Sequence, residues 1–202
     1  FSCENLQEGC ITDKQNPSFS YYVESDVPGT IIKNAHLEIN DWSLDTTQQI
    51  AIEYQGNKLQ PFKTYEAYLQ VEDNHGQKAS SKLTFETGRL DTPWAGQWIT
   101  DGTYHFQEKK VSPEPMLFRK QFNIKRELVS AKLYVTALGI YQCSVNGQSI
   151  GEDYFTPGFT SYKTNLQYQV YDILDKLQKE NQLDTIVTGG WAVGSFGMTR
   201  KN

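Results

Sequence analysis

Apolar and polar residues alternate in short runs along most of the chain, and this period of two predicts β-strands with one buried face. Strands are predicted at residues 18–23, 34–39, 50–54, 65–72, 82–86, 116–124, 131–137, 141–146, 166–171 and 183–187. The one predicted helix is short and runs from Ile173 to Lys179, with Asp172 as its N-cap. Many short strands, 7 prolines and 15 glycines place the chain in the all-β class.

A segment without alternation, GRLDTPWAGQW at residues 88–98, divides the chain and predicts a linker. Before it, residues 1–87 are predicted to form a fibronectin-III/Ig-like β-sandwich. The run LQPFKTY at residues 59–65 resembles the corner of fibronectin type III domains, where the hydroxyl of the tyrosine, here Tyr65, hydrogen-bonds to nearby backbone. After the linker, residues 99–202 are predicted to form a jelly-roll-like β-sandwich of the carbohydrate-binding-module type, truncated at its C-terminus.

The most informative stretch runs from Leu138 to Tyr171. Its first part alternates and then reaches Asn146-Gly147, a pair that tolerates positive φ and predicts a tight hairpin turn. Behind the hairpin, residues 152–159 form a loop that mixes acids, aromatic residues and a Pro-Gly turn. Cys143 lies on the apolar face of the first strand and is predicted to be a buried free thiol.

Residues in and around this stretch occur in an order that resembles the N-terminal region of bacterial α-L-rhamnosidases. They are Leu138-Gly139, Tyr141, Asn146-Gly147, Gly151, Pro157-Gly158, Thr160, Tyr162, Tyr168-Gln169, Tyr171-Asp172, Asn181, Gly190-Trp191 and Gly194, with Trp94, Trp98 and Ile99 in and beside the linker. The resemblance implies a non-catalytic N-terminal fragment of an enzyme that hydrolyses terminal α-L-rhamnosides with inversion and requires no organic cofactor. It also implies that the catalytic carboxylates lie in a later helical barrel.

Charge and composition exclude several other function classes. The net charge is -5 without a basic run, which argues against nucleic acid as a partner. No apolar stretch reaches the ~20 residues that span a bilayer, so no membrane partner is expected. No signal peptide pattern is visible, which predicts a cytoplasmic location, although the start at Phe1 leaves secretion open.

The cysteines and histidines do not predict a fold that is held by disulfide bonds or by a metal ion. The chain has 3 cysteines, and their odd number and wide spacing do not indicate a disulfide framework. A bond between Cys3 and Cys10 is one alternative, and a reduced pair in a cytosolic setting is the simpler one. The 3 histidines lie far apart, which argues against a zinc site or a histidine-activated nucleophile.

Glycoside hydrolysis needs two carboxylates that face each other, and no such pair can be placed in this sequence, so no catalytic residue is assigned. The resemblance implies instead a carbohydrate site with a structural calcium ion. The candidate sugar-binding residues are Asn146, Glu152, Asp153, Tyr154, Phe159 and Trp191. Glu152 and Asp153 are also the candidate calcium ligands, since calcium binds several oxygen atoms. The alternative is that Glu152 and Asp153 form a solvated loop tip and that Trp191 lies in the core.

The function expected from the resemblance is a scaffold that also helps to recognise carbohydrate. Its partners are then rhamnose-containing glycans or glycosides and the C-terminal catalytic domain of the same chain. An alternative of a different class is a pair of tandem β-modules from a surface adhesin or receptor that binds protein ligands. A stand-alone lectin is a third alternative, and the predicted truncation argues against it.

Overall fold

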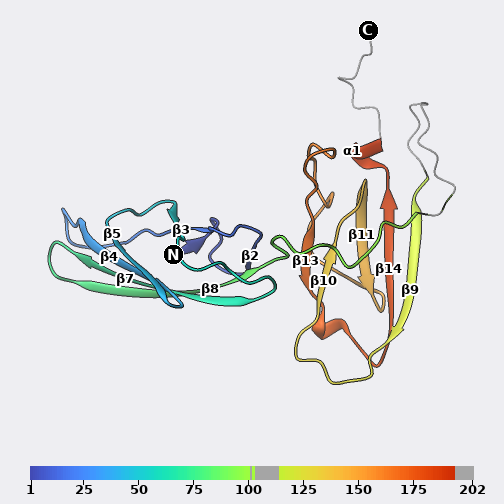
Figure 1. Cartoon of the computed structure of the whole chain (residues 1–202), viewed down its shortest axis with the longest axis horizontal. Helices are drawn as coiled ribbons and strands as arrows, with labels where there is room; N and C mark the ends of the chain where they lie inside the picture. Colours follow the sequence, from blue (N-terminus) through green and yellow to red (C-terminus); the bar gives the residue numbers. More distant parts are fainter. Residues whose placement is uncertain (101, 103–113, 194–202) are drawn as a thin grey trace, which may run out of the picture. The chain divides into compact units, whose positions relative to one another are not determined.

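A computed structural model describes residues 1–100, 102 and 114–193 of this 202-residue chain. The chain divides into two compact units, Phe1–Gln97 and Trp98–Asn202, and both are built from β-sheets (Figure 1). The predicted all-β class is therefore confirmed. Residues 88–97, which belong to the predicted linker, are part of the first unit.

The first unit consists of a three-stranded and a five-stranded sheet. The smaller sheet has the order β1-β3-β6, with β1 at Ser2–Cys3, β3 at Ser18–Ser20 and β6 at Ile52–Glu53. The larger sheet has the order β2-β8-β7-β4-β5, with β2 at Cys10–Thr12, β8 at Lys78–Thr87, β7 at Thr64–Asp73, β4 at Ile32–Ile39 and β5 at Trp42–Thr46. Strand β2 pairs with β8 in parallel, whereas the other pairs in these two sheets are antiparallel.

The core of the first unit comes from the inward positions of the alternating runs. Leu37, Ile39, Ala67 and Phe85 are all buried, as the period of two predicted. The sequence did not predict β1, β2 or β5. Strands β1 and β2 are short and lie in a polar segment, so alternation is weak there. Strand β5 does alternate, with Trp42 and Leu44 half-buried and Ser43 and Asp45 exposed, so the sequence carried a strand signal at this edge strand.

The predicted tyrosine corner is present. The Tyr65 hydroxyl accepts a hydrogen bond from the backbone N–H of Gln60 at 2.8 Å, and its ring stacks on Phe85 with centroids 5.4 Å apart. The buried Thr87 hydroxyl donates to the Gln60 carbonyl at 2.5 Å and accepts from the Lys63 N–H at 3.0 Å. The segment that enters β7 is therefore tied to the core by two hydroxyl groups, which confirms the interpretation of residues 59–65.

The second unit contains a four-stranded and a two-stranded antiparallel sheet in its described part. The larger sheet has the order β12-β11-β14-β9, with β12 at Gln148–Ser149, β11 at Ile140–Val145, β14 at Glu180–Thr188 and β9 at Met116–Asn123. The smaller sheet pairs β10 at Lys132–Val135 with β13 at Gln169–Asp172. Ala137, Tyr141, Cys143, Val145, Ile150 and Ile173 form the buried core, and Cys143 is a free thiol, as predicted.

The hairpin at the centre of this unit forms where the sequence predicted it. Asn146 and Gly147 have φ values of 52° and 78° and connect β11 to β12. Val145 pairs with Gln148 directly across the turn. Both turn residues lie in the left-handed region, which asparagine and glycine tolerate and which matches the twist of the two strands.

The predicted helix from Ile173 to Lys179 is wrong. The chain forms only a 3₁₀ turn, η1 at Leu174–Lys176, held by hydrogen bonds between residues three apart, and Leu177 is already extended. Asp172 accepts the N–H of Leu174 at 3.0 Å, but the N-cap of η1 is Ile173, which has no side-chain capping hydrogen bond, so the predicted N-cap is also wrong. The segment is too short to pay for helix nucleation, and β14 begins directly after it.

A four-residue helix, α1 at Gly190–Val193, lies where the sequence predicted none. Two glycines precede Trp191 there, and glycine is a poor helix former, so local propensity does not indicate a helix. Within the described ranges, no helix has the length and apolar character needed to cross a membrane.

Two asparagine side chains join the hairpin to the start of β14. The Asn146 amide donates to the Asn181 Oδ1 and to the Lys176 carbonyl, both at 2.9 Å, and its own Oδ1 accepts the Gln182 N–H at 2.9 Å. Asn181 is 5% exposed and exchanges two further hydrogen bonds with the backbone of Gln178. The turn, η1 and the first residues of β14 are thus connected through one pair of amides.

The tyrosine corner yields a stability prediction. We expect Tyr65→Phe to destabilise the first unit by about 1 kcal/mol, because the Gln60 N–H loses the acceptor that the buried Tyr65 provides. Urea unfolding of the full chain measures the loss, and faster amide hydrogen exchange at Gln60 locates it. Tyr68→Phe is the matched control on the outer face of the same strand, and we expect it to change stability by less than about 0.5 kcal/mol. Equal effects of the two substitutions would contradict the assigned role of Tyr65.

The hydrogen-bonded side chains of Asn146 and Asn181 yield a second stability prediction. We expect Asn146→Asp to destabilise the second unit by about 2–4 kcal/mol, because a carboxylate cannot donate and would face the oxygens of Asn181 and Lys176. The substitution retains the Gln182 acceptor and a side chain that tolerates positive φ. Gln148→Glu makes the same amide-to-acid change at an exposed position two residues away and serves as control. Urea unfolding of both variants would disprove this assignment if Asn146→Asp were as stable as Gln148→Glu.

Candidate functional site

Aromatic side chains gather at the surface of the second unit, on the loop that follows β12 and on α1. Phe155 and Phe159 are 63% and 66% exposed. Their ring centroids lie 5.7 and 6.2 Å from that of Trp191, and Phe159 meets Tyr162 edge-on at 6.3 Å. We call Phe155, Phe159, Tyr162 and Trp191 the aromatic cluster.

Buried backbone contacts hold the loop that carries this cluster. The Thr156 hydroxyl donates to the Tyr141 carbonyl, and the Tyr141 N–H donates to the Thr156 carbonyl, both at 2.9 Å. Thr156 and Pro157 are buried between the two exposed phenylalanines. The loop is therefore anchored to the start of β11, and the exposure of its phenylalanine rings is a consequence of a fixed backbone.

The predicted site residues occupy different environments around this loop. Tyr154 is 88% exposed, and the ring contacts with Trp191 involve its neighbour Phe155 instead. Trp191 is half-buried, which lies between the predicted stacking role and the alternative of a core residue. Glu152 is exposed at the loop tip. The structure thus brings Phe159 and Trp191 together, with Tyr154 and the acids at the margin.

Asp153 is exposed but has a partner. Its Oδ2 accepts a hydrogen bond from the Tyr171 hydroxyl at 3.0 Å. Burial and the neighbouring Asp153 carboxylate raise the pKa of Tyr171 to about 12, and burial also raises the pKa of Tyr141. Both phenols are therefore neutral at physiological pH and act as hydrogen-bonding groups, with Tyr141 donating to the Gln169 Oε1 at 2.6 Å.

The Asn146 side chain, in contrast, forms hydrogen bonds only within the protein. Its amide nitrogen and oxygen are both engaged by Asn181, Lys176 and Gln182. An amide that is satisfied inside the protein has little capacity left for a sugar hydroxyl. Its position in the family-like pattern therefore reflects the hairpin.

Glu152 and Asp153 supply fewer ligands than a calcium ion takes. Calcium binds six to eight oxygen atoms in proteins. In the part of the chain that the structure describes, no three His, Cys, Asp or Glu side chains come together, so no third acid joins these two. The remaining ligands of an ion here would be backbone carbonyls, amides or water.

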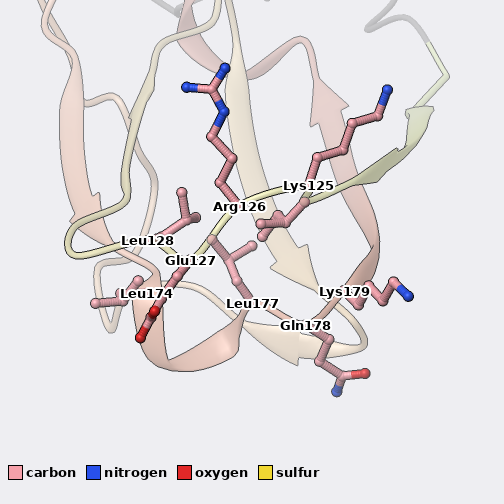
Figure 2. Close-up of a pocket in the computed structure, with 9 residues that line it drawn as sticks. Lys125, Arg126, Glu127, Leu128, Leu174, Leu177, Gln178 and Lys179 are labelled. Carbon is pink, nitrogen blue, oxygen red and sulfur yellow. The ribbon is translucent and has the colours of Figure 1, made fainter.

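The second unit also has a hollow of about 520 Å³, and none of the predicted site residues lines it. The side chains that line it come from the segment after β9 and from η1 and the residues that follow it: Ile124, Lys125, Arg126, Glu127, Leu128, Leu174, Leu177, Gln178 and Lys179. Figure 2 shows that the charged ends of Lys125, Arg126 and Lys179 project away from one another. Binding sites place a few polar groups so that they converge on a ligand, and this hollow does not.

The sequence did not single out Phe155 or Tyr162 as members of a surface cluster. Phe155 has a left-handed φ of 59°, and its ring meets Trp191, whereas Tyr154 is 88% exposed. For Tyr162, the only signal in the sequence was its place in the residue order that resembles α-L-rhamnosidases. Its hydroxyl donates to the Gly158 carbonyl at 3.2 Å, which places its ring beside Phe159.

Family models match both parts of the chain. Residues 1–91 match the Rha78A-like N-terminal immunoglobulin domain, and residues 126–202 match the α-L-rhamnosidase N-terminal domain. The two matches agree with the two β-sheet units of the structure.

Curated relatives and solved structures carry the same name. An α-L-rhamnosidase from Formosa agariphila is 28% identical over 163 residues, which cover 75% of this chain and 17% of that protein. One from Streptomyces avermitilis is 40% identical over 82 residues, which cover 40% of this chain and 8% of that protein. The structure of α-L-rhamnosidase from Dictyoglumus thermophilum superimposes with a TM-score of 0.80 at 27% identity, covering 92% of this chain and 24% of that one.

This chain therefore spans at most about a quarter of the length of these relatives. The matched parts are the N-terminal domains in both family models. The order of the two domains, the shared fold and the names of the relatives all agree. The chain therefore carries two domains that match those of α-L-rhamnosidases, an N-terminal immunoglobulin-like domain at residues 1–91 and an α-L-rhamnosidase N-terminal domain at residues 126–202.

Proposed function

We propose that this chain is the non-catalytic N-terminal part of an enzyme that hydrolyses terminal α-L-rhamnosides. The observation that carries the proposal is that the matches to α-L-rhamnosidase domains cover both units, while the chain covers only 17% and 24% of two such proteins. The catalytic carboxylates then belong to a further domain of the parent protein, which is the first partner of this fragment. These matches favour the rhamnosidase function over the adhesin alternative.

The second unit has a further role in this proposal, which is to recognise carbohydrate. L-Rhamnose is a 6-deoxyhexose, so it presents a methyl group and C–H faces that pack on aromatic rings. Phe159 and Trp191 offer such faces at the surface, and Glu152 and Asp153 lie on the same loop to accept hydrogen bonds from hydroxyl groups. Tyr154 and Phe155 extend the apolar surface beside them.

Calcium and cellular location remain predictions within this proposal. An ion at Glu152 and Asp153 would complete its coordination with carbonyl, amide or water oxygens and would fix the loop tip. No organic cofactor is required for hydrolysis by two carboxylates. The cytoplasm stays the predicted location, with secretion as the alternative.

The first functional prediction concerns activity. We expect this 202-residue chain to release no chromophore from an aryl α-L-rhamnoside above the buffer rate, because no pair of facing carboxylates has been assigned to it. A chromogenic assay at high protein concentration measures this, and a full-length α-L-rhamnosidase serves as positive control. Turnover by the purified chain would contradict the assignment of catalysis to another domain.

The second concerns binding. We expect L-rhamnose to bind with a Kd of about 1 mM, which is the range of a single small contact surface. Phe159→Ala removes an exposed ring and should weaken binding by about fivefold, the equivalent of one aromatic contact. Isothermal titration and chemical-shift perturbation measure both values. Tyr22→Ala, which removes a 68% exposed ring from the first unit, is the matched control and should leave the Kd unchanged.

The same titration tests calcium. If an ion supports the loop, EDTA lowers the affinity, added calcium restores it, and Asp153→Asn removes the response. If EDTA leaves the affinity for L-rhamnose unchanged, the calcium proposal is wrong, whereas the proposed aromatic binding surface is unaffected. Absence of binding at tens of millimolar sugar, in all of these conditions, would leave the second unit as a scaffold only.

A further inference from the structure

Two cysteines of the first unit are both buried in its core. Cys3 is 0% and Cys10 is 1% exposed, and both are free thiols. They lie on different sheets, Cys3 on β1 of the three-stranded sheet and Cys10 on β2 of the five-stranded sheet. The two short strands that the sequence did not predict are therefore the ones that carry these thiols.

The strand register places both cysteines at the same point of the core. Cys3 pairs with Phe19 on β3, and Cys10 pairs with Phe85 on β8. The rings of Phe19 and Phe85 meet edge-on across the space between the sheets, with centroids 5.5 Å apart. Side chains of directly paired residues point to the same face of a sheet, so the two cysteines face each other beside this ring contact.

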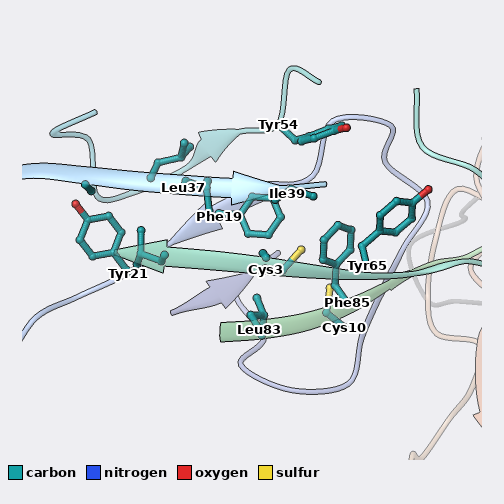
Figure 3. Packing of buried hydrophobic residues seen from close by; sticks show 14 of the residues in the cluster. Cys3, Cys10, Phe19, Tyr21, Leu37, Ile39, Tyr54, Tyr65, Leu83 and Phe85 are labelled. Atoms are coloured by element: carbon teal, nitrogen blue, oxygen red, sulfur yellow. The ribbon is translucent and has the colours of Figure 1, made fainter. Parts of the chain in front are cut away.

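The ionisation of the two thiols agrees with this placement. Cys10 raises the pKa of Cys3, and Cys3 lowers the pKa of Cys10. Figure 3 shows the two sulfur atoms in the aromatic core, beside the ring of Phe85. Cys143 differs in this respect, because it lies in the second unit, where its thiol is paired with the Thr185 hydroxyl at 3.3 Å.

The backbone between the two cysteines makes this meeting possible. Cys3 and Leu6 exchange backbone hydrogen bonds of 2.8 and 2.9 Å around Glu4 and Asn5, which have φ values of 48° and 68°. The chain reverses there and then passes from one sheet to the other before Cys10. A turn so close to Cys3 brings two residues that are well separated along an extended chain into the same core.

We propose that Cys3 and Cys10 form a dithiol–disulfide pair, which a small-molecule disulfide such as oxidised glutathione converts into a bond between the two sheets of the first unit. One cysteine thiolate attacks a sulfur of oxidised glutathione, forms a mixed disulfide and releases one glutathione thiolate. The second cysteine thiolate then attacks the protein sulfur of that mixed disulfide and releases the second glutathione. Two protein thiols are oxidised, and one glutathione disulfide is reduced to two thiols.

The pair reacts slowly while the core is closed. Both thiols are buried, so a disulfide such as oxidised glutathione has no access to either of them. Cys10 and burial raise the pKa of Cys3, whereas Cys3 lowers the pKa of Cys10, so Cys10 supplies the attacking thiolate once the core opens. Oxidation therefore has to follow opening of the segment that carries β1 and β2. For this reason the experiment has to reach equilibrium from both the reduced and the oxidised side.

The test is a redox titration of the full chain. Native protein, started both reduced and oxidised, is equilibrated in mixtures of reduced and oxidised glutathione, quenched with acid, labelled with N-ethylmaleimide and digested with trypsin. We expect the peptide that ends at Lys14, which contains both cysteines, to lose about 2 Da and to carry no label in the oxidised form. The Cys143 peptide should remain labelled throughout.

A parallel titration in urea separates a core-driven bond from a bond that any short loop would form. We expect the equilibrium constant for the Cys3–Cys10 bond to be at least about tenfold larger in the native chain than in the unfolded chain, and oxidation to raise the Tm of the first unit by roughly 5 °C or more. Cys143→Ser should reproduce these values, whereas Cys10→Ser should yield only a glutathione adduct at Cys3. An equal or smaller constant in the native chain, or full labelling of both cysteines from both directions, would overturn the proposal.

Discussion

The second unit depends on one contact between two amides. Asn146 in the hairpin turn and the buried Asn181 at the start of β14 hydrogen-bond to each other, and both also bond to backbone near η1. Because buried polar groups are costly when unpaired, the turn, η1 and β14 have to form together. This constraint sets the position of β11 beside β14, and β11 in turn anchors the loop that presents the aromatic cluster.

The residues that resemble the family pattern are mostly those that close this packing. A Cβ on Gly139 would lie 2.1 Å from the Thr188 carbonyl oxygen, and one on Gly151 would lie 2.4 Å from the Tyr171 ring. Glycine is required where another group approaches so closely. The pattern therefore identifies the fold of an α-L-rhamnosidase N-terminal domain. The surface that would meet a sugar is carried by the loop between these fixed points.

In the first unit, aromatic packing rather than an amide pair holds the elements together. Its two sheets meet through the edge-on contact of Phe19 and Phe85, and within the larger sheet Phe85 stacks on Tyr65, whose hydroxyl holds the corner segment. Cys3 and Cys10 lie within this aromatic core rather than at its edge. A covalent bond there would reinforce a junction that packing already defines.

The sequence by itself determined the all-β class, the Asn146-Gly147 turn and the Tyr65 corner, because each follows from local chemistry: alternation, tolerance of positive φ, and a hydroxyl close to its backbone partner. It overestimated the helix after Asp172, where the chain forms only a 3₁₀ turn whose N-cap is Ile173. Only the tertiary structure decided that Asn146 serves the fold, that Phe155 joins Phe159 beside Trp191, and that Cys3 meets Cys10. Those outcomes depend on contacts between segments that are distant in the chain, and local patterns in the sequence do not reveal such contacts.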